Sequence, residues 1–158
     1  MFVGYYNSPI GIIEIIATDN AVISIDFINI KEKHENLNDL IIIVQKELTE
    51  YFNKKRKRFS FAFELKGTEF QKKIWKYLLN IPYGKTLSYK EVAKAIGNEK
   101  GVRAVANAIG ANKLVVFIPC HRVIGSDGSL TGFTGGIDKK EYLLSLEGIS
   151  VKGNIIAK

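Results

Sequence analysis

The hydrophobic pattern of this chain changes near residue 66, and this change limits the possible folds more than any other feature. Before it, short apolar and β-branched runs, some of them alternating, are typical of strands; they lie at residues 2–6, 12–17, 21–28 and 59–65. Between the last two runs, apolar residues from Leu37 to Phe52 recur at helical spacing. The first half therefore predicts a small antiparallel sheet with one helix.

From residue 67 onward the pattern becomes helical. Two capping boxes, Thr68 with Gln71 and Ser88 with Glu91, each predict the start of a helix. The first helix should bury Phe70, Ile74, Tyr77 and Leu78, and the second should span residues 89–96 and end at Gly97. A helix over residues 102–109 follows a turn of about four residues, which is the pattern of a helix-turn-helix. A last helix is expected at 137–147, closed by Gly148.

These elements predict an α+β protein with two domains. Residues 1–66 should form an N-terminal domain of a small antiparallel sheet with one helix. Residues 67–158 should form a mainly helical C-terminal domain that contains the helix-turn-helix. With 46% hydrophobic residues and three prolines, a chain of 158 residues can bury a proper core.

Cysteine usage and apolar run lengths exclude several classes of protein. A single cysteine, Cys120, excludes an internal disulfide and a cysteine-rich zinc site, so we expect no metal and a reducing, cytoplasmic location. The start of the chain lacks the pattern of a signal peptide, and the apolar runs are too short to span a bilayer. We therefore expect no membrane partner.

The net charge of +7 favours a polyanionic partner, of which nucleic acid is the first candidate. The densest basic run is residues 54–58, between a predicted helix and a predicted strand. It fits a solvated connector as well as a surface that contacts DNA.

The segment Pro119-Cys120-His121-Arg122-Val123 holds the only cysteine, followed directly by an imidazole and a guanidinium. A cysteine beside an apolar run is usually an inert core residue. Nearby cationic or imidazole groups, however, lower the pKa of a thiol and make it reactive. The segment alone leaves both interpretations open.

The helix predicted at 102–109 carries an unusual outward face, made of Arg103, Ala104, Asn107, Ala108 and Ala111. A helix that reads base edges usually presents several long polar side chains. Small side chains with one arginine fit either a close approach to a surface, with the arginine as a probe, or packing against another part of the protein.

Two further features near the C-terminus have both a functional and a plain interpretation. Glu147 stands on the apolar side of the last helix, in its final turn, where a carboxylate opposes the helix dipole. It is either exposed or compensated by a buried imidazole. The glycine-rich stretch at 125–136, with a turn at Asp127-Gly128, is either a flexible surface loop or a mobile wall over a pocket.

Together these pieces resemble the O6-alkylguanine-DNA alkyltransferase family, the methylated-DNA–protein-cysteine methyltransferases. The resemblance covers about residues 67–152, and the N-terminal half is similar only in outline. It rests on Ser88-Tyr89, Arg103-Ala104-Val105, Asn112, residues 119–123, Gly135-Gly136, Leu143-Leu144 and Glu147-Gly148.

The resemblance implies a catalytic role for five residues and no cofactor. Cys120 would take the alkyl group from guanine O6 in one displacement and keep it as a thioether, so that one molecule repairs one lesion. His121 would accept the thiol proton through a water, because neighbours in an extended segment point to opposite sides. Glu147 would hold the imidazole, Asn112 would fix the turn beneath the cysteine, and Tyr89 would donate a proton or hydrogen bond to the guanine ring.

The resemblance also implies how DNA is bound. The damaged base has to leave the duplex, and Arg103 would fill the gap that it leaves. The small face of the helix, with Ala104 and Asn107, would enter the minor groove, and binding would follow shape and phosphates, not sequence. The remaining contacts to DNA or base would come from Ser88, Phe133, the backbone N–H of Thr134, and the carbonyls of Cys120 and Val123.

The expected partner is double-stranded DNA that contains O6-alkylguanine, with O4 of thymine as an additional target, and the expected state is a monomer. Phe133 departs from the family, because many members have tyrosine there, and this leaves the accepted alkyl size open. The alternatives are a non-catalytic protein that binds alkylated DNA, a helix-turn-helix regulator, and a cysteine hydrolase using Cys120 and His121. Their signatures would be binding without any gain of mass, or turnover of an ester or peptide.

Overall fold

The computed structural model describes residues 1–133 and 135–156, and the chain divides into two compact units. Unit 1 comprises Met1–Lys66 with Lys113–Phe117, and unit 2 comprises Gly67–Asn112 with the chain from Ile118 onward. The five residues 113–117, which the sequence-based boundary left in the C-terminal domain, thus belong to unit 1. The structure is α+β, as predicted.

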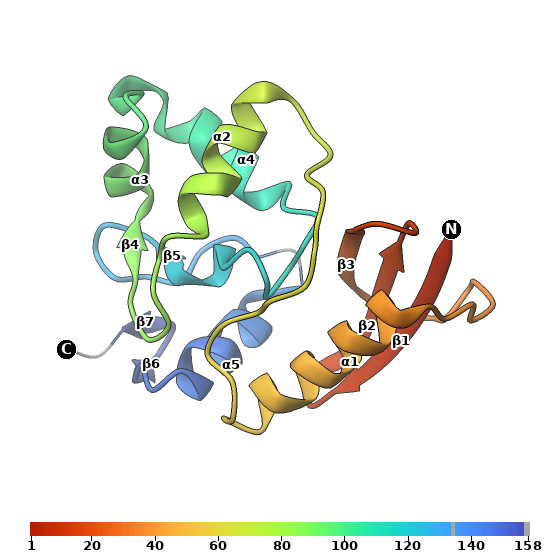
Figure 1. Ribbon diagram of the computed structural model, residues 1–158. Helices are drawn as coiled ribbons and strands as arrows, with labels where there is room; N and C mark the ends of the chain where they lie inside the picture. The colour runs from red at the N-terminus through yellow and green to blue at the C-terminus, as the bar shows by residue number, and fades with distance from the viewer. Residues whose placement is uncertain (134, 157–158) are drawn as a thin grey trace. The chain divides into compact units, whose positions relative to one another are not determined.

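Unit 1 is a three-stranded antiparallel sheet with one helix packed against it (Figure 1). The strands β1 (Phe2–Ser8), β2 (Gly11–Ala17) and β3 (Val22–Ile28) are adjacent in chain order, and α1 spans Asp39–Phe52. A side chain at Gly4 would collide with Ile41 of α1, so this glycine allows the helix to approach the sheet. The predicted sheet and helix are therefore confirmed.

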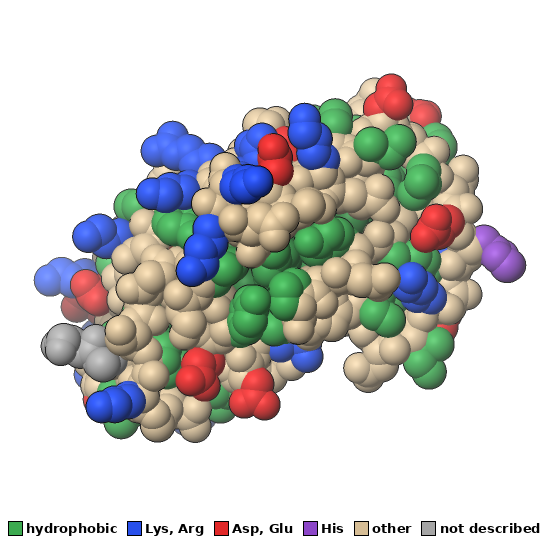
Figure 2. All heavy atoms as spheres, turned by 90° about the horizontal axis from the view of Figure 1, so that it is seen from below, with side chains coloured by type: hydrophobic (Ala, Val, Ile, Leu, Met, Phe, Trp, Pro, Cys, Tyr) green, Lys and Arg blue, Asp and Glu red, His purple; other side chains and the backbone are tan. Residues whose placement is uncertain are grey.

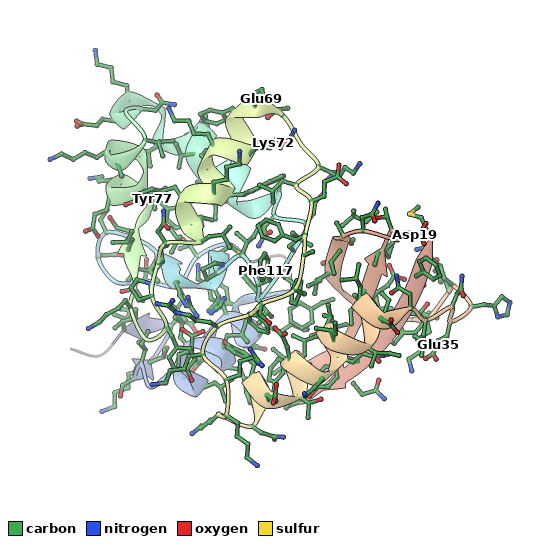
Figure 3. All side chains as sticks on the ribbon, viewed as in Figure 1. Asp19, Glu35, Glu69, Lys72, Tyr77 and Phe117 are labelled. Atoms are coloured by element: carbon green, nitrogen blue, oxygen red, sulfur yellow. The ribbon has the colours of Figure 1, made fainter. Side chains whose placement is uncertain are left out.

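The prediction of a fourth strand at residues 59–65 is wrong. Only one bridge forms there, between Val22 and Phe63. Ser60 instead donates its backbone N–H and its hydroxyl to the buried carboxylate of Glu47, at 2.8 and 2.6 Å. The aromatic rings of this segment gather around Phe117, whose ring centroid lies 4.6 to 6.1 Å from theirs (Figure 3). A helix carboxylate, ring packing and this single bridge thus hold the segment, without a longer sheet ladder.

Unit 2 begins with three packed helices, α2 (Glu69–Leu78), α3 (Tyr89–Ala95) and α4 (Val102–Gly110) (Figure 1). Both capping boxes form in full, and Gly97 takes the positive φ of 78° that ends α3. The 3-10 turn Glu99–Gly101 joins α3 to α4. The helix-turn-helix predicted from the sequence is present.

The buried stripe of α2 is rotated from the predicted one. Trp75 is buried and donates its indole N–H to the carbonyl of Ala108 at 2.8 Å, whereas Phe70 is 37% exposed. This contact also places Ala108 inside, at 4% exposure, so its predicted position on the outward face of α4 is wrong. Figure 3 shows Glu69 and Lys72 on the first turns of α2, where they form an exposed ion pair of 3.7 Å.

Short strands connect the helix-turn-helix to the cysteine segment. Strand β4 (Leu87–Ser88), directly before α3, pairs in parallel with β5 (Val123–Ile124), directly after the cysteine turn. The chain continues through α5 (Ile137–Leu146) to an antiparallel pair, β6 (Val151–Lys152) and β7 (Ile155–Ile156). Because β4 and β5 are paired, the start of α3 and residues 120–122 are held near each other. Among the residues that the structure describes, no helix has the length and hydropathy needed to cross a bilayer.

Candidate active site and nucleic-acid interface

Cys120 begins a buried 3-10 turn, Cys120–Arg122, and is only 5% exposed. The extended geometry expected for this segment is therefore wrong. Below the turn, the side-chain amide of Asn112 donates to the carbonyl of Ile118 at 2.9 Å and lies 3.2 Å from Cys120 Sγ. The structure thus brings Asn112 to the position expected of it, where one amide fixes the turn and contacts the sulfur.

Behind the cysteine, Glu147 holds both residues that follow it in the chain. His121 Nε2 lies 2.7 Å from Glu147 Oε2, and Arg122 donates from Nε and Nη2 to the two carboxylate oxygens at 2.7 and 2.9 Å. Gly84 N–H adds a fourth contact at 3.2 Å. The carboxylate is buried at the C-terminal end of α5, and these donors compensate its position against the helix dipole. Of the two interpretations of Glu147, the structure favours the compensated one.

The contacts of Glu147 determine which nitrogen of His121 can act as a base. Burial acts to raise the pKa of Glu147, but the hydrogen bonds and charges of His121 and Arg122 outweigh it and hold that pKa well below its ordinary value. An ionised carboxylate only accepts hydrogen bonds, so Nε2 carries the proton and Nδ1 has the free lone pair. In the described part of the chain, Nδ1 has no hydrogen-bond partner and no hydrogen bond joins Cys120 to the ring. A direct cysteine–histidine dyad is therefore not formed.

Burial is the largest influence on the pKa values of Cys120 and His121. It raises the pKa of Cys120, although the amide of Asn112 and the charge of Lys140 act in the opposite direction. It also lowers the pKa of His121, which Glu147 only partly offsets. His121 is thus neutral at rest, as a proton acceptor has to be, and the thiol needs help to ionise.

Tyr89, the first residue of α3, is joined to the glycine-rich stretch. Its hydroxyl donates to the carbonyl of Thr131 at 2.9 Å. The ammonium of Lys140 on α5 donates to the same carbonyl at 2.9 Å and lies 3.4 Å from the Tyr89 hydroxyl. Burial raises the pKa of Tyr89, so the phenol keeps its proton near neutral pH.

A cavity of about 720 Å³ lies between α4, the start of α3 and this stretch. Four of the residues singled out from the sequence line it, namely Tyr89, Arg103, Asn107 and Phe133. The other residues that line it are Val102, Ala106, Gly110, Thr131 and Gly132. Residues 131–133 thus form part of a pocket wall, which was one of the two interpretations of the glycine-rich stretch.

The other expected site residues that the structure describes do not line this cavity. Cys120 is not among its lining residues, and Ala104 is exposed elsewhere on α4. The side chain of Ser88 caps α3, and Val123 is fully buried in β5, so neither side chain reaches the cavity. Thr134 lies outside the described residues.

Two residues that sequence reasoning missed are part of the site. Arg122 was quoted in the motif without a role, although it shares Glu147 with His121 and donates to the carbonyl of Ile81 at 2.6 Å. Lys140 was not singled out at all. Its signal was its spacing, three and four residues before Leu143 and Leu144, which places it on the apolar face of α5.

The positive charge is concentrated in unit 2. Its sequence has thirteen Lys and Arg against seven Asp and Glu, whereas unit 1 has ten against nine. Figure 2 shows one face of the molecule, on which Lys and Arg side chains lie among apolar side chains and several Asp and Glu side chains. The unit that carries the helix-turn-helix is therefore the basic one, as phosphate binding requires.

Comparisons with known proteins identify the family of this chain. Residues 69–149 match the family model described as 6-O-methylguanine DNA methyltransferase, DNA binding domain, and residues 1–65 match its ribonuclease-like domain. A methylated-DNA–protein-cysteine methyltransferase of Methanosarcina barkeri is 41% identical, over 93% of this chain and 97% of its own length.

Solved structures give the same result. The Mycobacterium tuberculosis O6-methylguanine methyltransferase superposes with a TM-score of 0.84 at 36% identity, covering 92% of each chain. A second structure from that organism, described as OGT in complex with DNA, has a TM-score of 0.83 at 37% identity, covering 90% of each chain.

Proposed function

This chain belongs to the 6-O-methylguanine DNA methyltransferase family, and we propose that it repairs DNA by moving an alkyl group from guanine O6 to Cys120. Alkyl transfer from DNA to a cysteine of the enzyme is the activity of this family, and Cys120 is the only cysteine. The observation that carries the proposal is the arrangement behind this residue. Glu147 accepts a hydrogen bond from Nε2–H of His121 at 2.7 Å, which leaves Nδ1 as the basic nitrogen.

The proposed transfer is a single displacement. A water carries the thiol proton from Cys120 to Nδ1 of His121, and Glu147 stabilises the imidazolium that forms. The thiolate then attacks the alkyl carbon, a sulfur–carbon bond forms, and the bond from that carbon to O6 breaks. Its electron pair goes to the purine, where the phenol proton of Tyr89 neutralises the developing charge. The thioether is permanent, because no group in the chain removes it.

DNA docks through α4 in this proposal. Arg103 and Asn107 are exposed on α4 beside the cavity, and Ala104 is exposed on the same helix. This surface enters the minor groove, and Arg103 fills the space of the rotated guanine. Binding depends on phosphates and groove shape, so its affinity falls as salt rises.

The rotated base occupies the cavity, where the ring of Phe133 stacks on it. We assign to the backbone N–H of Thr134 the contact with O6, and to the carbonyls of Cys120 and Val123 the contacts with the exocyclic amine. Because Cys120 is only 5% exposed, the base reaches its sulfur after residues 131–133 have moved.

The remaining assignments concern the state of the protein. We propose that it acts as a monomer on double-stranded DNA with O6-alkylguanine, and that O4-alkylthymine is an additional substrate. The acceptor has to be a free thiol, which places the protein in a reducing compartment, the cytoplasm.

A labelled duplex tests the proposal. Incubation with DNA that carries a radiolabelled O6-methylguanine transfers the label to the wild type, up to one methyl group per molecule. Cys120→Ala accepts none, yet binds the duplex with unchanged affinity, because α4 is intact. Binding without transfer by the wild type would identify a lesion-binding protein or a regulator, and turnover of an ester would identify a hydrolase.

Arg103→Ala tests the proposed extrusion of the base. The variant should transfer from duplex DNA at least tenfold more slowly than the wild type and react with a free O6-alkylated guanine at the wild-type rate, since the cost of unstacking is about a few kcal/mol. Asn98→Ala, in the turn before α4, is the control on the same motif. Equal losses of Arg103→Ala on both substrates would refute its role in extrusion.

A further inference from the structure

The basic run at residues 54–58, which we call the basic connector, has no task in the proposed docking of DNA through α4. It holds five of the ten Lys and Arg residues of unit 1 and follows the C-terminal end of α1 (Figure 1). The other five stand against nine Asp and Glu residues, so the rest of unit 1 has a side-chain charge of −4, whereas the connector has +5. The near neutrality of unit 1 therefore hides a local concentration of positive charge.

The structure anchors the connector through its middle residue. Arg56 donates from Nε to Glu50 Oε1 at 3.0 Å, and its guanidinium lies 3.7 Å from the buried Glu47. It also donates from Nη1 to the carbonyl of Arg58 at 2.8 Å. Both carboxylates belong to α1 and contact this one guanidinium, so the structure uses one of the five cations as an anchor.

The other four cations of the connector, at positions 54, 55, 57 and 58, are exposed. Among the residues that the structure describes, no carboxylate forms an ion pair with Lys54, Lys55 or Arg58. The dipole of α1 favours cations at its C-terminal end, but its influence falls off within the last turn and does not explain Arg58. These three charges are thus available to an anion from outside the chain.

The backbone at the start of the connector favours glycine, yet a lysine stands there. Lys54 has a φ of 61°. Its N–H donates to the carbonyl of Tyr51 at 3.0 Å, and the N–H of Lys55 donates to that of Glu50 at 2.8 Å. This is the Schellman end of a helix, where glycine is the usual residue because a Cβ raises the energy of a left-handed backbone. Stability alone therefore does not account for the lysine at this position.

We propose that the basic connector is a second DNA-binding surface, which holds phosphates of the duplex and takes no part in the chemistry. The identity of this polyanion rests on the proposed function. Duplex DNA presents one phosphate charge for about every 1.7 Å of its axis, and long cationic side chains match such a row without reading base edges. The run contains no apolar or aromatic residue that could stack on a base or enter a lipid layer.

The experiment is the salt dependence of binding to an undamaged duplex, measured by fluorescence anisotropy. The logarithm of the association constant falls with the logarithm of the salt concentration, with a slope of about −0.9 for each neutralised phosphate. The triple variant Lys54→Gln/Lys55→Gln/Arg58→Gln should make this slope shallower by about 2.7 and weaken binding at about 0.1 M salt by at least about tenfold. Transfer at saturating methylated duplex should keep the wild-type rate constant, because Cys120 and α4 are unchanged.

Two further variants make the test specific. Lys31→Gln/Lys46→Gln/Lys66→Gln removes three exposed charges from elsewhere in unit 1, and it should change the slope by less than about 0.9, the value for one contact. Lys54→Gly removes one charge where glycine is favoured, so the slope should become shallower by about 0.9 while the urea midpoint rises. This variant carries the test if the triple variant of the connector does not fold.

The possible results separate this inference from the proposed function. If the wild type transfers but the connector variants keep its salt slope, or if the control variant loses as much, the connector is a solvated segment, and the inference is refuted while the reaction stands. Binding to anionic lipid vesicles that the triple variant loses while it keeps its DNA affinity would refute it in favour of a membrane surface. If the connector variants lose DNA affinity but the wild type transfers nothing to Cys120, the proposed function fails and this inference stands.

Discussion

At the scale of single residues, one carboxylate sets the protonation of its two neighbours. Glu147 accepts from Arg122 through two nitrogens and from His121 through Nε2, all within 2.9 Å and all buried. The arginine keeps the carboxylate ionised, and the ionised carboxylate keeps the proton of His121 on Nε2. The choice of the basic nitrogen therefore depends on Arg122 as well as on Glu147.

Replacing this carboxylate should damage both stability and transfer. Glu147→Gln leaves the buried Arg122 without a counter-charge, which should lower the free energy of unfolding by about 3 kcal/mol. Transfer should also slow, because the imidazolium loses its partner. Urea denaturation and labelled-duplex assays measure the two effects. Glu141→Gln on the same helix is the control, and equal stability of the two variants would contradict this account.

The stability of the protein should fall as the pH drops below about 6.5. His121 has a folded-state pKa lowered from 6.5, so the unfolded chain takes up a proton that the native state does not. This uptake should cost up to about 1.4 kcal/mol per pH unit, until the pH reaches the folded pKa of His121. Below about pH 4, a second loss of stability should follow, because Glu147 takes up a proton in the unfolded chain but not in the native state, where its pKa is lowered.

The histidine variants assign the first of these losses. Between pH 7 and 5.5, the urea midpoint of His121→Gln should depend less on pH than that of the wild type. His34→Gln, which replaces an exposed histidine, should keep the wild-type dependence. A wild-type slope in His121→Gln would mean that another group takes up the proton.

Residues of the site differ in how far the sequence could predict them. Asn112, His121 and Glu147 could be singled out with Cys120, because they belong to the motifs on which the resemblance rests. In the structure Asn112 contacts Cys120, and Glu147 contacts His121. The turn geometry at Cys120 and the shared use of Glu147 by Arg122 were not predictable, because both depend on contacts between segments far apart in the chain. Their individual roles in transfer stay predictions.

At the scale of elements, two similar capping boxes allow an effect on stability to be distinguished from an effect on transfer. Ser88 Oγ accepts from Glu91 N–H at 3.0 Å, and Thr68 Oγ1 accepts from Gln71 N–H at 3.1 Å. The first opens α3 next to Tyr89, whereas the second opens α2 away from the cavity.

Removing either cap should have the same effect on stability but not on repair. Ser88→Ala and Thr68→Ala should each lower the free energy of unfolding by about 1 kcal/mol. Only Ser88→Ala should slow transfer, because it loosens the turn that positions Tyr89. Thermal denaturation and single-turnover transfer measure both variants side by side. A slower transfer in Thr68→Ala of the same size would show that general loosening is responsible.

Elements with local signals were predicted well, and those with tertiary causes were not. Capping boxes and a terminal glycine are local, so the helix-turn-helix was found within a residue or two at each end. The segment at 59–65 has the composition of a strand, but Ser60 bonds to Glu47 of α1, and only one bridge, to Val22, joins the segment to the sheet. Strand pairing depends on such distant partners, which a single segment does not show.

At the scale of the whole molecule, the candidate active site and most of the excess positive charge both lie in unit 2. The basic excess, the helix-turn-helix, the cavity and the cysteine all lie there, whereas unit 1 is almost neutral. A boundary near residue 66 was visible in the hydrophobic pattern. The assignment of residues 113–117 to unit 1 was not, because it follows from the bridge of Leu114 to Ile25 in β3.

Intact-protein mass spectrometry after exposure to methylated duplex, with peptide mapping of the product, tests the central claim most directly. We predict that the whole sample gains the mass of one methylene unit and no more, and that fragmentation assigns it to the sulfur of Cys120. An unchanged mass, an adduct at another residue, or demethylated DNA in excess over the protein would contradict the account.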